Sequence, residues 1–164
     1  MRFAPAAAAL SLFFATTASV TSAQDREADP RAEALVMQGQ AALAAGDTQG
    51  AIDAFEAALA VDPGHTPIFL ELAEAARQDG LQGKAIRYYR EALARDPGNF
   101  AAISGEGAAL VEKGAVEKAK LNLARLQSLC GDKCPETVAL QTTIAAGPPA
   151  RLAADTADEA AISN

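Results

Sequence analysis

Apolar and small residues recur along this chain at the three-and-four spacing of one helix face, in short segments separated by polar breaks. One such segment begins near Ala32, and a second follows that carries Ile52 and Phe55. Between them, Gly46 can adopt the left-handed backbone conformation that commonly ends a helix, and Asp47 can cap the helix that follows. The pattern therefore predicts pairs of short helices joined by tight turns.

The pattern repeats with a fixed period. Asp62-Pro63-Gly64 returns 34 residues later as Asp96-Pro97-Gly98, and the same shift aligns Phe55 with Tyr89. A third, less regular copy places Gly131 where the two prolines stood. A period of about 34 residues is typical of one helix-turn-helix unit copied along a chain.

These features predict an all-α fold, a helix-turn-helix repeat solenoid closed by a C-terminal capping helix. Two polar residues are expected to mark the starts of later helices. Thr66 is expected to cap the third helix, and Asn99 the fifth. The predicted segments are a flexible lead at 24–31, repeats at 32–65, 66–99 and 100–133, a capping helix at 134–146 and a disordered tail at 147–164.

Residues 1–23 differ from the rest of the chain. A positive start at Arg2 precedes an apolar, alanine-rich run without acidic side chains, and Thr21-Ser22-Ala23 supplies the small residues of a signal peptidase site. We expect cleavage after Ala23, with an uncleaved membrane anchor as the alternative. No later segment reaches spanning length, so we expect no membrane insertion after signal removal and a periplasmic or secreted protein.

The charge of the chain is negative and unevenly placed. The formal net charge is -7, and residues 32–65 hold five acids and no Lys or Arg. Nucleic-acid binding needs clustered basic residues for phosphate contacts, so the composition argues against a nucleic-acid partner. Solubility is the simpler explanation of the negative charge, and the more specific alternative is that the first repeat binds a basic partner.

The repeats resemble those of the tetratricopeptide repeat family. That family has a large residue early in its first helix, a small residue one turn later, a small-large-small pattern in its second helix and a closing proline. Gln38 and Glu106 depart from it, since the family prefers Leu there. The matching residues are Leu35, Gly39, Ala51, Phe55, Ala58 and Pro63, then Phe69, Ala73, Ala85, Tyr89, Ala92 and Pro97, then Ile103, Gly107, Ala119, Leu123, Leu126 and Gly131.

The resemblance implies that the first helix of each pair lines a concave groove that binds a protein segment. In the branch of the family that clamps a terminal carboxylate, basic and amide side chains hold set positions. Here Val36, Gln40, Glu71, Ala101 and Gly105 hold them, so that branch is excluded. The groove suits an amphipathic or extended segment with apolar anchors and basic neighbours. The predicted groove residues are Val36, Gln40, Leu43, Leu70, Glu71, Glu74, Arg77 and Val111.

Cys130 and Cys134 are the only two cysteines. In an exported protein such a pair is expected to form a disulfide, and here it would fasten the sixth helix to the capping helix where the turn proline is missing. Two alternatives remain, a redox-active pair and a copper site. Cys-x-x-x-Cys-Pro resembles the motif of Sco-type copper assembly proteins, although no βαβ pattern accompanies it here.

No catalytic, cofactor or metal site is predicted elsewhere. His65 is the only histidine, and no nucleophile or orienting group can be assembled around it. Tyr88 is expected on the convex face. We therefore expect a non-enzymatic periplasmic adaptor, and family analogy points to envelope assembly, secretion or pilus biogenesis. Self-association through the end face near the first helix is an open alternative, as is a thiol-redox or copper-handling role.

Overall fold

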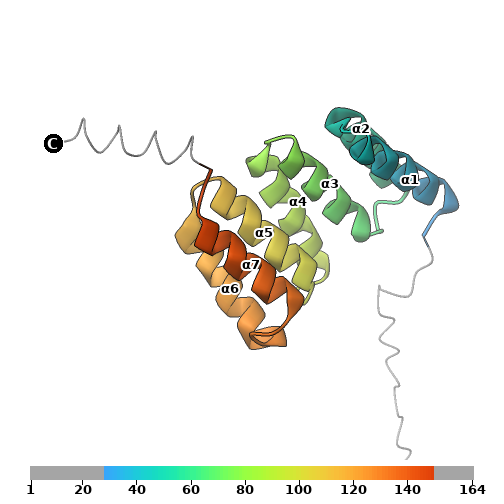
Figure 1. Ribbon diagram of the computed structural model, residues 1–164. Helices are drawn as coiled ribbons and strands as arrows, with labels where there is room; N and C mark the ends of the chain where they lie inside the picture. The colour runs from blue at the N-terminus through green and yellow to red at the C-terminus, as the bar shows by residue number, and fades with distance from the viewer. Residues whose placement is uncertain (1–27, 150–164) are drawn as a thin grey trace, which may run out of the picture.

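The computed structural model describes residues 28–149, which form seven helices and no strand (Figure 1). This is the all-α helical repeat that the sequence predicts. The predicted signal peptide, residues 24–27 of the lead and residues 150–164 of the tail lie outside the described residues. The helices are α1 (Pro30–Ala44), α2 (Thr48–Val61), α3 (Pro67–Gln78), α4 (Gln82–Arg95), α5 (Phe100–Glu112), α6 (Val116–Cys130) and α7 (Pro135–Ala146).

The helices stack in the order of the chain. Helices α1 and α2, α3 and α4, and α5 and α6 form packed pairs, and each pair contacts the next one. Helix α7 packs against both α5 and α6 and closes the stack at the end opposite α1 (Figure 1). Among residues 28–149 no helix combines the length and apolar character needed to cross a membrane.

Glycines at the ends of α1, α3 and α5 set the turn within each pair. Gly46, Gly80 and Gly114 have φ of 79°, 77° and 84°, a left-handed conformation that side chains with a Cβ disfavour. These three glycines are spaced by the 34-residue period, so the turn geometry repeats with the sequence.

Side-chain caps follow the sequence prediction at two helices out of three. Asp47 accepts a hydrogen bond from the backbone N–H of Gly50 at 2.9 Å, and Asn99 accepts one from Ala102 at 2.9 Å. The cap predicted at Thr66 is wrong. Its backbone is already helical, with φ -52° and ψ -38°, and its side chain makes no cap hydrogen bond.

The aspartates of the repeated Asp-Pro-Gly turn also have a structural role. In each copy, Asp62 or Asp96 accepts a hydrogen bond from the N–H of the glycine two residues later, at 3.2 Å. Asp62 is buried and accepts a second hydrogen bond from the N–H of Asp29, also at 3.2 Å. The first turn therefore also holds the start of α1.

Three glycines inside helices allow large side chains to reach the helix backbone. A Cβ added at Gly39 would clash with the ring of Phe55, one at Gly105 with the ring of Tyr89, and one at Gly107 with the side chain of Leu140. These contacts join α1 to α2, α4 to α5, and α5 to α7. Gly105 and Gly107 cost intrinsic helix stability, and this close packing offsets the cost.

The sequence prediction for Tyr88 is wrong. It is buried rather than exposed on the convex face, and its hydroxyl donates to Oε1 of Glu56 on α2 at 3.0 Å. The Tyr88 side chain is therefore hidden from solvent, and its hydroxyl reaches across to α2 of the preceding pair. Glu106 is likewise buried, paired with Arg90 at 2.6 Å and hydrogen-bonded by Asn122 at 3.1 Å.

We predict opposite effects for two glycine-to-alanine substitutions. Gly39→Ala should destabilise the fold by about 1–3 kcal/mol, because the rigid Phe55 ring leaves no room for a methyl group. Gly83→Ala should stabilise it by about 0.4–1 kcal/mol, because the nearest atom, Nζ of Lys113, is 3.9 Å from the added Cβ. Urea unfolding measures both. A loss of stability in both variants, or in neither, would contradict the packing described.

Candidate binding groove

The structure contains an open pocket of about 490 Å³ between α3, α5 and α7, and Tyr89 of α4 also lines it. Seven of its ten lining residues are uncharged and three are glutamates, and none is Lys or Arg. The pocket is therefore largely apolar and carries only negative formal charges. Its lining residues are Leu70, Glu71, Glu74, Tyr89, Ala101, Ser104, Gly105, Pro135, Glu136 and Ala139.

Helix α3 supplies one wall. Leu70 is half-buried and packs on the hydrophobic core, and Glu71 lies next to it at the pocket. Nε2 of Gln40, on α1, donates a hydrogen bond to Oε1 of Glu71 at 2.9 Å. Two predicted groove residues, one from the first repeat and one from the second, are therefore in direct side-chain contact.

Arg77 is held by two carboxylates. Its guanidinium pairs with Glu74 at 2.9 Å and with Glu112 on α5 at 2.5 Å, and it also donates through Nε to Glu74 at 3.0 Å. Although burial alone would lower it, these hydrogen bonds and charges raise the pKa of Arg77 above its already high value. Arg77 is therefore charged, and its hydrogen bonds are directed at α3 and α5 themselves.

Glu74 is the centre of this network. It accepts hydrogen bonds from Arg77, from Gln78 at 3.1 Å and from the Tyr89 hydroxyl at 3.2 Å. Burial alone would raise the pKa of Glu74, but the hydrogen bonds and the Arg77 charge hold it below its usual value. Burial and the Glu74 charge raise the pKa of Tyr89, so its hydroxyl stays protonated and donates to Glu74.

Helix α7 supplies the opposite wall, which the sequence analysis did not assign to the groove. Pro135, Glu136 and Ala139 line the pocket, and Oγ of Ser104 on α5 donates to the backbone oxygen of Glu136 at 3.1 Å. The 34-residue period could have predicted that the start of α7 lines the pocket. Pro135 and Ala139 lie one period after Ala101 and Gly105, which also line the pocket.

The remaining predicted groove residues fall into two groups. Val36 and Leu43 lie on α1, are half-buried and pack on the core, outside the lining of this pocket. Val111 is only 1% exposed, so the prediction that it offers an apolar contact to a partner is wrong. It lies in the last turn of α5 and belongs to the hydrophobic core.

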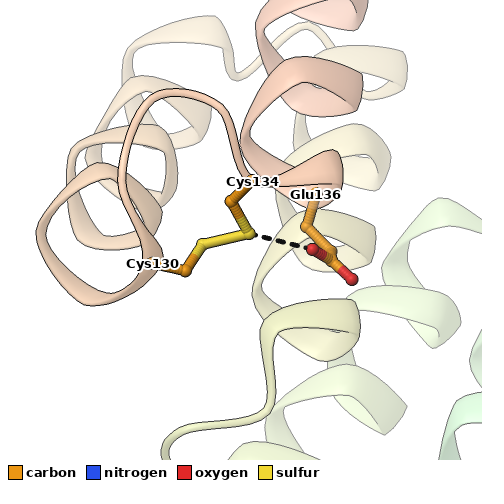
Figure 2. Close-up of side chains that lie close together, drawn as sticks. All are labelled: Cys130, Cys134 and Glu136. Atoms are coloured by element: carbon orange, nitrogen blue, oxygen red, sulfur yellow. Dashed lines mark hydrogen bonds between the residues drawn. A yellow bond between two sulfur atoms is a disulfide. The ribbon is translucent and has the colours of Figure 1, made fainter.

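A disulfide joins Cys130 at the end of α6 to Cys134 before α7, with a Cα–Cα distance of 5.7 Å (Figure 2). The Glu136 side chain points toward this bond, and its Oε2 lies 3.0 Å from Sγ of Cys134. The two sulfurs and a carboxylate oxygen of Glu136 lie within 4.8 Å of one another. Because both sulfurs are in the disulfide, neither is a free thiolate for a metal ion in this state.

We predict that the Glu74 network makes stability depend on pH. A carboxyl whose pKa is lower in the folded than in the unfolded state stabilises the fold above the unfolded value, and this contribution disappears as the pH falls through the folded value. The Tm advantage of wild type over Glu74→Gln should therefore persist from pH 7 to about 4.5 and vanish below that. Glu91→Gln, which removes only an exposed helix-surface pair with Arg95, is the control. An advantage that does not depend on pH would contradict this account.

Residues 36–100 match the tetratricopeptide repeat family. The first such domain of Spaghetti (RPAP3), bound to the HSP90 peptide SRMEEVD, is 22% identical with a TM-score of 0.64, covering 73% of this chain and 98% of that one. The Sgt2 domain from Aspergillus fumigatus is 25% identical with a TM-score of 0.64, covering 71% and 78%. The Yersinia enterocolitica type III secretion chaperone SycD, in complex with a peptide of the translocator YopD, is 24% identical with a TM-score of 0.60, covering 70% and 86%.

A comparison with curated proteins found no match. The 34-residue period and the stacked helix pairs agree with the family match and with the similar solved structures. Residues 36–100 therefore carry tetratricopeptide repeats, and the described residues have the helical-repeat fold of that family.

Proposed function

We propose that this protein is a non-enzymatic scaffold that binds a segment of another protein along the face formed by α1, α3, α5 and α7. The observation that carries the proposal is the pocket between α3, α5 and α7, which is open, largely apolar and lined by residues of four helices. A concave site with a few polar groups among apolar ones is the common form of a recognition site.

Two of the similar structures support this proposal through what they bind. SycD is in complex with a peptide of YopD, and the Spaghetti domain is bound to an HSP90 peptide. That second peptide, SRMEEVD, contains three acids and one base. The glutamate-lined pocket of this chain would repel such a peptide, so we propose a partner of different charge.

Exposed apolar side chains extend the proposed binding face beyond the pocket. Met37 is 64% exposed on α1 and Val138 is 47% exposed on α7. In the repeat register Met37 corresponds to Glu71, and Val138 corresponds to Leu70 and Ser104, so both fall on the groove side of their helices. A bound segment would gain its apolar contacts from these two residues and from Leu70, with Val36 and Leu43 bordering them.

We also propose that the protein acts in the periplasm, where it would serve envelope assembly, secretion or pilus biogenesis. The sequence of residues 1–23 and the cysteine pair support export. Self-association through the end face near α1 is a competing use of the solenoid.

A thiol-redox or copper-handling role is the second candidate function, and the cluster of Cys130, Cys134 and Glu136 is the observation that favours it. Replacing both cysteines by Ser separates the two candidates. A structural disulfide predicts a loss of at most about 2 kcal/mol in stability, the chain-entropy value for so short a loop, with partner binding retained. Unchanged stability together with lost cellular function would favour the redox or copper role.

The scaffold proposal predicts a specific crosslinking pattern. A photo-crosslinkable residue at Leu70 or Val138 should capture the same protein in cells, whereas one at Leu121, which is 71% exposed on α6, should not. Mass spectrometry identifies the captured protein. Equal capture at all three positions would show that the groove has no special role.

A further inference from the structure

Two carboxylates face the pocket without a basic partner. Glu71 on α3 and Glu136 on α7 both line it, and among the described residues neither forms an ion pair with Lys or Arg. Glu71 accepts one hydrogen bond from Gln40, and Glu136 contacts the Cys134 sulfur. Each lies on one wall of the pocket, so the space between them is electrostatically negative.

The one basic residue of α3 cannot neutralise them. Arg77 follows Glu74 by one helical turn on α3, but its guanidinium is engaged by Glu74 and Glu112. Glu74 and Glu112 share the single positive charge of Arg77, so the carboxylates of Glu71 and Glu136 are left without a basic partner at the pocket. A cation entering the pocket would therefore be attracted without displacing an existing ion pair.

The rest of the pocket is uncharged and permits close approach. Gly105 packs against the Tyr89 ring, and because it has no side chain the pocket stays open above this ring. Ala101 and Ala139 add only methyl groups, and Leu70 and Pro135 add apolar surface. The aliphatic stem of a long basic side chain would bury against these groups while its charged end reaches the carboxylates.

We propose that this pocket receives a Lys or Arg side chain of the bound segment, flanked in that segment by small or apolar residues. This inference rests on the proposed function and names the chemistry of its partner. Charge complementarity selects the occupant: Glu71 and Glu136 pair with the basic group, and the apolar lining takes its neighbours. The segment 150–164 of this chain fits poorly, since it holds three acids and one base.

A random dodecamer display library, selected on the full chain, tests the inference. Wild type should enrich peptides with Lys or Arg between small or apolar residues. The double variant Glu71→Gln/Glu136→Gln should lose the basic enrichment but keep the apolar one. Glu91→Gln/Glu117→Gln, which removes two exposed acids on α4 and α6, should behave as wild type. Leu70→Asp should abolish enrichment altogether.

Binding measurements with one selected peptide then give the contribution of its basic residue to affinity. Replacing its basic residue by norleucine should weaken binding to wild type about tenfold or more, as for a charge-assisted contact, and should change binding to the Glu71→Gln/Glu136→Gln variant by less than about twofold. Raising the salt concentration should weaken only the basic peptide, because partly exposed pairs are screened.

The outcomes separate the inference from the proposed function. If wild type enriches apolar peptides without Lys or Arg, and Leu70→Asp removes them, the groove binds segments but the inference is wrong. If the basic enrichment survives in the Glu71→Gln/Glu136→Gln variant, these carboxylates are not its cause and the inference is also wrong. If nothing enriched depends on Leu70, both proposals fail.

Discussion

The stack depends on large side chains packing directly onto helix backbone at glycine. Phe55 meets Gly39 within the first pair, Tyr89 meets Gly105 between the second and third pairs, and Leu140 meets Gly107 between α5 and α7. Each contact brings two helix axes closer than a Cβ would allow, and close-packed interiors tolerate little change in volume. With few aromatic residues and no Trp, the core is made mainly of Ala, Leu and Ile around these contacts.

The same contacts shape the proposed binding site. Gly105 brings α5 against Tyr89, and the absence of a side chain at this position keeps the pocket open. Gly107 receives Leu140 and so brings α7 against α5, which makes the first turn of α7 a pocket wall. The Cys130–Cys134 disulfide and the Ser104 hydrogen bond hold the start of this helix. Core packing and groove geometry are therefore parts of one arrangement.

Periodicity predicts the repeated parts of this fold well. The turn glycines, the caps at Asp47 and Asn99 and the buried face of each second helix depend on local sequence and on the partner helix within one pair. The errors at Tyr88 and Val111 have a different origin. A register assigns a residue to a side of its helix, but a neighbouring pair decides whether that side is covered, and this depends on how the pairs stack.

The α7 wall shows a second limit of sequence reasoning. A capping helix is expected to cover the exposed face of the last repeat, and this expectation assigns none of its residues to the groove. Only its stacking as the first helix of an incomplete fourth pair places Glu136 opposite Glu71. The negative pocket results from that placement, because the two glutamates come from segments 65 residues apart.

The central claim is that the face formed by α1, α3, α5 and α7 binds a protein segment. The most direct measurement is an NMR titration of the isotope-labelled protein with a peptide selected on it. Our account predicts shift changes concentrated at the amides of Leu70, Gly105 and Ala139, with the outer faces of α2 and α6 unchanged. Changes confined to those outer faces, around Asp53 and Leu121, would contradict it.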